Sequence, residues 1–256
     1  MLSNFAIKLK QGTVMKLIAA QVSSIAGDIS QNLGKHVRLI DVGARHGADG
    51  IFFPELSLTG YQPALAESLA MLPSDPRLDA FQQQSDRHGI LIAVGAPTRG
   101  KQGIEISMIT FQPGVARCTY SKRHLHADEL PFFSCGTEQR LFSCADHVLA
   151  PAICYESLQT SHALQAAEAG AQVYFTSVAK SERGVAAAYD HYPRIARQHA
   201  MTVLMANCVG AADDYVGAGQ SAIWNSEGKM VVSADASGEA LVIYDSCTGR
   251  GKVEQL

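Results

Sequence analysis

The chain has 256 residues and a mass of 27.3 kDa, with 47% apolar and 18% charged residues. This length favours one large α/β domain, and the apolar content suffices for a full hydrophobic core, which excludes a disordered or fibrous protein. The 21 Lys and Arg residues against 24 Asp and Glu residues give a net charge of −3, so no nucleic-acid-binding groove is expected.

The start of the chain predicts neither secretion nor membrane insertion. Residues 1–14 show no clear periodicity and are expected to be an appendage, possibly without order, with the folded domain spanning residues 15–256. No apolar run approaches the ~20 residues that span a bilayer, and the first residues lack the apolar stretch and cleavage site of a signal peptide. We expect a cytoplasmic protein with no membrane partner.

The first half of the chain alternates strands and helices. An apolar run at residues 17–20 predicts a buried strand, and the spacing of Leu33, Val37, Ile40 and Ala44 predicts an amphipathic helix that Asp28 or Ser30 caps. Further elements are expected at residues 51–53 (strand), 77–88 (helix), and 90–94, 105–111 and 116–120 (strands).

The second half continues this alternation and closes with strands. Strands are expected at residues 148–154, 173–177, 203–207, 221–224, 230–234 and 241–244, and helices at residues 161–169 and 185–200. No Pro-rich or Ser-rich linker interrupts the pattern, so we predict one layered α/β domain.

The cysteines and histidines show no metal-binding pattern. The six cysteines are scattered without a Cys-x-x-Cys pair, and the histidines are not paired at metal-ligand spacing. We therefore expect neither a disulfide framework nor a metal site.

Three reactive side chains follow predicted strands, where α/β proteins place their active sites. Burial of Glu55 would raise its pKa toward that of a general base. Lys122 offers a positive charge that could stabilise an oxyanion or a thiolate. Cys154 lies between a buried strand and a helix, a rigid position that suits a nucleophile. Each alone could equally be a surface charge or a core thiol.

Three segments that contain these residues resemble the catalytic segments of the nitrilase, or carbon–nitrogen hydrolase, superfamily. They read FFPELSLTGY (52–61), YSKRHL (120–125) and PAICYESL (151–158), in the family's order and at typical separations. Supporting similarity extends to MKLIAAQV near the start, ALQAAEAGAQVYFTSVA (163–179) and AGQSAIWNSEGKMV (218–231).

The resemblance implies an α-β-β-α sandwich that forms a homodimer and needs no cofactor. It also implies a Glu–Lys–Cys catalytic set of Glu55, Lys122 and Cys154, in which Glu55 moves protons and Cys154 forms a thioester. Lys122 and the backbone N–H of Tyr155 would stabilise the oxyanion, and Glu129 would orient Lys122 or the substrate. The further residues expected to contact substrate are Tyr61, Phe133 and Ser177.

The substrate class stays open at the level of sequence. Cys154 is followed by Tyr155-Glu156, where many amidases and carbamoylases of the family have an aspartate and nitrile-specific branches often have Trp-Glu. A small carboxamide is the first expectation, followed by an N-carbamoyl compound and a nitrile. The membrane-bound acyltransferase branch shares Cys-Tyr-Glu, but its transmembrane helices have no counterpart here.

Two alternatives of other kinds remain. One is a metabolite-binding protein that keeps the fold without turnover. The other is a hydrolase that pairs Cys154 with His124 or His191 as the base. Four cationic residues could receive a substrate carboxylate, namely Arg123, Lys180, Arg183 and Arg197.

Overall fold

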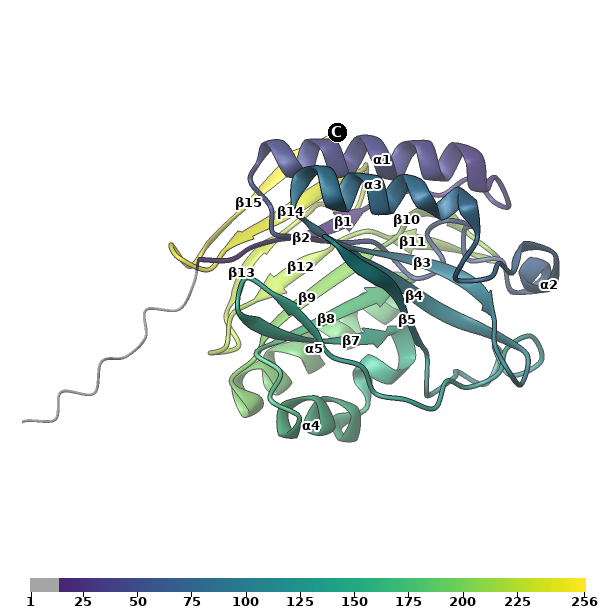
Figure 1. The fold of residues 1–256 in the computed structure, drawn as a ribbon. Helices are drawn as coiled ribbons and strands as arrows, with labels where there is room; N and C mark the ends of the chain where they lie inside the picture. Colours follow the sequence, from purple (N-terminus) through teal and green to yellow (C-terminus); the bar gives the residue numbers. More distant parts are fainter. Residues whose placement is uncertain (1–13) are drawn as a thin grey trace, which may run out of the picture.

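The computed structural model describes residues 14–256, in which two β-sheets pack face to face between two layers of helices (Figure 1). Residues 1–13 lie outside the described part of the chain. The predicted appendage at residues 1–14 therefore stays a prediction.

One sheet contains seven strands and joins the two ends of the described chain. They are β1 (Lys16–Gln21), β2 (Gly50–Phe52), β3 (Leu91–Arg99), β4 (Ile104–Gln112), β5 (Val115–Ser121), β14 (Ala240–Asp245) and β15 (Arg250–Gln255). Their order is β15-β14-β1-β2-β3-β4-β5. β1, β2 and β3 run parallel to one another, and the remaining neighbours are antiparallel.

The other sheet contains six strands around a parallel centre. They are β6 (Phe142–Cys144), β7 (His147–Ile153), β8 (Val173–Val178), β9 (Thr202–Asn207), β12 (Ala222–Trp224) and β13 (Met230–Ser233). Their order is β13-β12-β9-β8-β7-β6, with β7, β8 and β9 parallel. A separate hairpin consists of β10 (Val209–Ala212) and β11 (Tyr215–Ala218).

Helices cover the outer face of each sheet. The α-helices are α1 (Ile29–Arg45), α2 (Ala66–Leu69), α3 (Asp79–His88), α4 (Thr160–Glu168) and α5 (Glu182–His199), and the 3-10 helices are η1 (Pro63–Leu65), η2 (Pro76–Leu78) and η3 (Cys154–Leu158). α1 and α3 lie over the seven-stranded sheet, and α4 and α5 lie over the six-stranded sheet (Figure 1). The predicted four-layer α-β-β-α sandwich is confirmed.

Apolar side chains fill all three interfaces between the layers. Ile18 and Ile51 of the seven-stranded sheet pack in one cluster with Leu39 and Ile40 of α1. Between the sheets, the rings of Phe52 and Phe175 lie 4.4 Å apart. Burial of these side chains provides most of the driving force for folding. No helix within residues 14–256 is long and apolar enough to cross a membrane.

The predicted helices and strands are all present, with ends shifted by a few residues. The side chain of Asp28 caps α1 by accepting a hydrogen bond from the backbone of Gln31 at 3.0 Å. Four short or polar strands were not predicted, namely β6, β10, β11 and β15. The last of these, β15, pairs with β14 at the edge of the seven-stranded sheet.

Candidate active site

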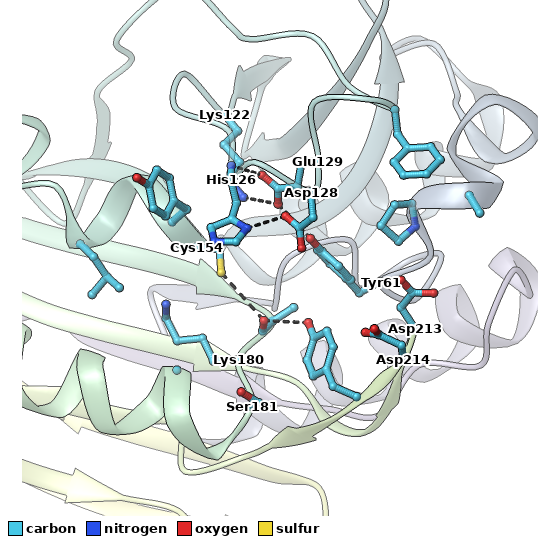
Figure 2. A pocket seen from close by; sticks show the side chains of 18 residues that line it. Tyr61, Lys122, His126, Asp128, Glu129, Cys154, Lys180, Ser181, Asp213 and Asp214 are labelled. Carbon is cyan, nitrogen blue, oxygen red and sulfur yellow. Dashed lines mark hydrogen bonds and ion pairs between the residues drawn. The ribbon is translucent and has the colours of Figure 1, made fainter.

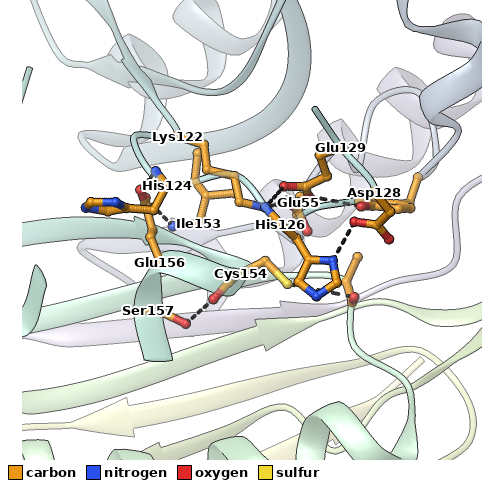
Figure 3. Close-up of polar contacts among 12 residues, drawn as sticks. Glu55, Lys122, His124, His126, Asp128, Glu129, Ile153, Cys154, Glu156 and Ser157 are labelled. Carbon is orange, nitrogen blue, oxygen red and sulfur yellow. Dashed lines mark hydrogen bonds and ion pairs between the residues drawn. The ribbon is translucent and has the colours of Figure 1, made fainter. Parts of the chain in front are cut away.

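Glu55, Lys122 and Cys154 are brought together from both sheets. Glu55 follows β2 and Lys122 follows β5 in the seven-stranded sheet, whereas Cys154 follows β7 in the six-stranded sheet. Figure 3 shows these side chains converging, with Glu129 beside them. The site therefore lies where the ends of strands from the two sheets meet.

Lys122 is the centre of a buried charge cluster. Its Nζ donates a hydrogen bond to Oε1 of Glu55 at 2.8 Å and to Oε1 of Glu129 at 2.6 Å, and all three side chains are shielded from solvent. An ammonium group has three N–H donors, so one remains for another acceptor. Because Lys122 also lines the cavity beside Cys154, this third donor is available to a substrate oxygen.

Glu129 is held by several donors besides Lys122. The hydroxyl of Tyr61 donates to Oε1 of Glu129 at 3.0 Å, and the backbone N–H of His126 donates to Oε2 at 2.7 Å. These contacts leave Glu129 little freedom, and its carboxylate fixes the position of the Lys122 ammonium.

The Glu55 segment runs directly against β3. A Cβ atom on Gly95 would lie 2.4 Å from the carbonyl oxygen of Pro54 and 2.5 Å from the backbone nitrogen of Leu56, so this position has no room for a side chain. Leu56, just after Glu55, has a φ of 51°. Such left-handed conformations of non-glycine residues are costly and cluster at functional sites.

Cys154 also has a left-handed backbone, with a φ of 45°, at the start of η3. Its Sγ lies 3.9 Å from the carbonyl oxygen of Ala179, which follows β8. The hydroxyl of Ser157 donates to the carbonyl oxygen of Cys154 and also bonds to the hydroxyl of Tyr192. The surrounding structure thus holds the thiol in a strained, defined position.

Burial separates the proton affinities of Glu55 and Cys154. It raises the pKa of Glu55 to about 7, against the opposing charge of Lys122. It raises the pKa of Cys154 to about 11, and the charge of Glu55 adds to that rise. At neutral pH the thiol therefore keeps its proton, and the Glu55 carboxyl is partly ionised and able to accept it.

The other groups of the cluster support this distribution of charge. Burial alone would lower the pKa of Lys122, but the charges of Glu55, Cys154 and Glu129 raise it, so the ammonium stays protonated. Oε2 of Glu55 is buried and has no hydrogen-bond partner within residues 14–256. This oxygen is free to receive a proton.

Glu156 joins the Lys122 loop to the Cys154 turn, a role that the sequence analysis did not assign. Its Oε1 accepts from the hydroxyl of Tyr120 at 2.7 Å and from the backbone of Ile153 at 2.8 Å. Its Oε2 accepts from the backbone of Arg123 at 2.7 Å and of His124 at 3.3 Å. The position of Glu156 two residues after Cys154 was the available signal, but its partners at the end of β5 lie more than 30 residues away in the chain.

A cavity of about 570 Å³ opens beside Cys154 (Figure 2). Aromatic side chains contribute to its wall, and two lysines and several carboxylates also face it. Its lining includes Tyr61, Lys122, His126, Asp128, Glu129, Cys154, Tyr155, Lys180, Ser181, Gly184, Asp213, Asp214 and Tyr215.

Two residues expected to contact substrate lie elsewhere. Phe133 is buried in the apolar cluster between the sheets, and its neighbour Phe132 lines the cavity instead. Ser177 is buried, and its hydroxyl donates to the carbonyl oxygen of Phe53 at 2.7 Å. Its position at the end of β8 placed it near the site in the chain, but the side chain faces the other sheet. Tyr61 and Tyr155 do line the cavity.

The two histidines considered as bases are not part of the cavity lining beside Cys154. The ring of His124 points away from Cys154 in Figure 3 and packs toward His162, with ring centroids 6.1 Å apart. His191 lies in α5, where its Nε2 is buried without a hydrogen-bond partner in the described part of the chain. His126, which was not predicted, does line the cavity and bonds to Asp128 at 2.5 Å.

No three His, Cys, Asp or Glu side chains in residues 14–256 are grouped so that they could hold a metal ion. The six cysteines are free thiols. The chemistry that the site offers comes from the carboxyl, ammonium and thiol groups described above.

Known proteins resemble this chain in sequence. The chain is 26% identical over 239 residues to glutamine-dependent NAD(+) synthetase of Acinetobacter baylyi, covering 88% of this chain but 43% of that protein. It thus spans less than half the length of these relatives. It is also 26% identical to 2-oxoglutaramate amidase of Bacillus subtilis, covering 80% of each protein.

Solved structures share the fold. A mutant of the amidase from Nesterenkonia sp. AN1 in complex with butyramide superposes with a TM-score of 0.83 at 20% identity, covering 93% of each chain. The profile of the carbon-nitrogen hydrolase family matches residues 16–247. This match covers nearly the whole chain, and the chain belongs to the carbon-nitrogen hydrolase family.

Proposed function

We propose that this carbon–nitrogen hydrolase is an amidase that releases ammonia from a small linear carboxamide through a thioester on Cys154. The observation that carries the proposal is the buried Glu55–Lys122–Glu129 cluster facing a protonated thiol at the cavity. The named relative 2-oxoglutaramate amidase supports an amide substrate.

The first half of the reaction forms the thioester. Glu55 takes the thiol proton while Sγ of Cys154 bonds to the amide carbon, and the carbonyl electron pair moves to oxygen. The free N–H of Lys122 and the backbone N–H of Tyr155 stabilise this oxyanion, each typically worth about 3–4 kcal/mol. The C–N bond then breaks, and the nitrogen leaves as ammonia with the proton from Glu55.

The second half returns the enzyme to its starting state. Glu55 takes a proton from water as the water oxygen attacks the thioester carbon. The C–S bond breaks, the carboxylic acid leaves, and the proton on Glu55 returns to the sulfur. Every proton is accounted for by one carboxyl group, which a pKa near neutrality favours.

The first test is ammonia release from a panel of small carboxamides, N-carbamoyl compounds and nitriles. We expect release from a carboxamide by the wild-type protein and none above background by Cys154→Ala. Cys144→Ala is the matched control, because this buried thiol lies in β6 and should be dispensable. Equal release by Cys154→Ala would contradict the mechanism, and a better carbamoyl or nitrile substrate would change the subclass.

A second test separates the lysine mechanism from a cysteine–histidine mechanism. Lys122→Met should lower kcat/KM by at least about 100-fold, because an oxyanion donor is lost. His124→Ala and His191→Ala should stay within a few-fold of wild type. The opposite pattern would support a histidine base. Thermal unfolding of Lys122→Met would show whether the variant still folds.

The metabolite-binding alternative makes a different prediction. If the protein binds without turnover, no amide should yield ammonia, and Cys154 should resist alkylation by iodoacetamide at neutral pH. Selective alkylation of Cys154 would instead indicate an active nucleophile.

The family resemblance also leads us to propose a homodimer in the cytoplasm. Light scattering would test the assembly, and a monomeric mass would contradict it.

A further inference from the structure

Lys180 is a buried cation in the catalytic cavity that the proposed mechanism does not use. It is only 5% exposed, lines the cavity, and its ammonium points into the space beside Cys154 (Figure 2). Within residues 14–256, its Nζ has no hydrogen bond or ion pair. The stem is buried while the ammonium opens onto the cavity, so a ligand anion bound there is the natural partner for this group.

The backbone of Lys180 is fixed on both sides. Its N–H donates to Oδ1 of Asn207 at 2.8 Å, and its carbonyl oxygen accepts from Nδ2 of Asn207 at 3.1 Å. The same oxygen accepts from the backbone of Ala218 at 2.9 Å. The preceding residue, Ala179, contacts the sulfur of Cys154. This segment is therefore placed rigidly against the nucleophile.

The stem of Lys180 packs against the first turn of α5, where glycine makes room for it. A Cβ atom on Gly184 would lie 3.1 Å from Cβ and 3.3 Å from Cγ of Lys180. This packing limits the rotamers of the lysine, and the ammonium is directed toward the cavity before any ligand binds.

The amino end of α5 adds a second favourable contribution for an anion. Ser181 is the N-cap, but its side chain makes no capping hydrogen bond, and both Ser181 and Gly184 line the cavity. The first backbone N–H groups of an 18-residue helix lack partners within the helix, and the helix dipole is positive there. Lys180 and this helix end thus face the same space.

The carboxylates of the cavity wall do not neutralise Lys180. Glu129 is paired with Lys122, and Asp128 bonds to His126. The other two, Asp213 and Asp214, are exposed to solvent in the turn between β10 and β11. Exposed charges interact weakly through water, whereas a buried ammonium interacts strongly with a desolvated anion. The electrostatic selection therefore favours an anionic rather than a cationic substrate.

We propose that Lys180 and the amino end of α5 bind a carboxylate of the substrate, so that the preferred substrates are monoamides of short dicarboxylic acids. This inference rests on the proposed amidase function. The amide carbon lies at Sγ of Cys154, and the carboxylate at the other end of the molecule accepts hydrogen bonds from the Lys180 ammonium and the α5 backbone.

The test compares each anionic amide with a neutral analogue of the same shape. Succinamate is paired with 4-oxopentanamide, and glutaramate with 5-oxohexanamide, in which a methyl group replaces one carboxylate oxygen. For the anionic amide that is the better substrate, we expect kcat/KM to exceed that of its neutral analogue by about 10- to 100-fold, a typical effect of a charged hydrogen bond. Most of this difference should come from a lower KM for the anionic amide, with similar kcat values for the two compounds.

Variants of Lys180 then assign the preference. Lys180→Met should bring the ratio of anionic to neutral kcat/KM close to 1, and Lys180→Arg should restore part of it. Arg183→Met is the matched control, because Arg183 is an exposed cation in the first turn of α5, close to Lys180 in the chain. This variant should keep the wild-type ratio. If Lys180→Met lowered kcat/KM equally for an anionic amide and for its neutral analogue, the inference would be overturned. Lys180 would then act on the thiol of Cys154 and not on a substrate carboxylate.

A binding measurement separates this inference from the proposed function. Titration calorimetry with Cys154→Ala should show succinamate or glutaramate binding, weakened about 10- to 100-fold by adding Lys180→Met. Binding that does not depend on Lys180 would overturn the inference even if amides are hydrolysed. Lys180-dependent binding without ammonia release would instead contradict only the proposed turnover.

Discussion

The carboxyl group of Glu55 sets the pH range in which the proposed nucleophile works. Burial raises its pKa to about 7, and only the ionised form accepts the thiol proton. We therefore expect kcat/KM to increase with pH through one ionisation near 7 and to fall about tenfold per pH unit below it. Initial rates of ammonia release between pH 5 and 9 would measure this limb.

Substitution of the same residue checks the assignment. Glu55→Gln should lower kcat/KM by about 100- to 10,000-fold and remove the ionisation near 7, because no base remains. A limb centred near 4.5 in the wild-type protein would show that the carboxyl titrates as an ordinary glutamate. The assigned base would also be wrong if Glu55→Gln kept the ionisation near 7.

At the scale of elements, Glu156 connects the end of β5 with η3. Four donors from the two segments meet its carboxylate, and each such bond to a charged group contributes about 1.5–3 kcal/mol. We expect Glu156→Gln to lower the free energy of unfolding by about 2–4 kcal/mol, since one of its polar atoms would face a donor. Urea denaturation would measure the loss.

Glu156→Gln should reduce kcat more than it raises KM, because the hydrogen bonds that hold the segments of Lys122 and Cys154 together are weakened. Glu168→Gln, an exposed position in α4, is the control and should leave both stability and kinetics near wild type. Wild-type kcat in folded Glu156→Gln would show that this link does not position the site.

At the scale of the whole molecule, the site depends on the alignment of the two sheets. Ser177 of β8 donates to the carbonyl oxygen of Phe53, two residues before Glu55, and thus ties the sheets together beside the base. We expect Ser177→Ala to cost about 1–3 kcal/mol of stability and to lower kcat several-fold without a specific rise in KM. Thermal unfolding and steady-state kinetics would measure both effects.

Thr176 provides the matched control for this prediction. Its hydroxyl is also buried, but it donates to Leu204 of β9 within the same sheet, at 2.9 Å. Thr176→Val should cost similar stability and leave kcat nearly unchanged. A rise in KM alone in Ser177→Ala would instead return Ser177 to the substrate-contact role expected from sequence.

Local patterns of side chains were enough to predict most elements, and the resemblance to the carbon–nitrogen hydrolase family singled out the three segments of the candidate site. The apolar run of β1 and the spacing of apolar residues in α1 report burial directly, because each is a property of neighbouring residues. Glu55, Lys122 and Cys154 were proposed as the catalytic set because each follows a predicted strand within a segment that resembles the family. β15 was missed because RGKVEQ has no apolar run, and its strand conformation depends on pairing with β14.

The tertiary structure decided which groups meet across the two sheets. The sequence named Lys180 as one of four cations. Only the fold shows that its side chain is buried beside Cys154, with its ammonium at the cavity and unpaired among residues 14–256. The packing of the two sheets also places the hydroxyl of Ser177 against Phe53, and it brings the end of β5 to the carboxylate of Glu156. These contacts join residues far apart in the chain, so they depend on how the sheets pack and on the desolvation that this packing imposes, which local periodicity does not encode.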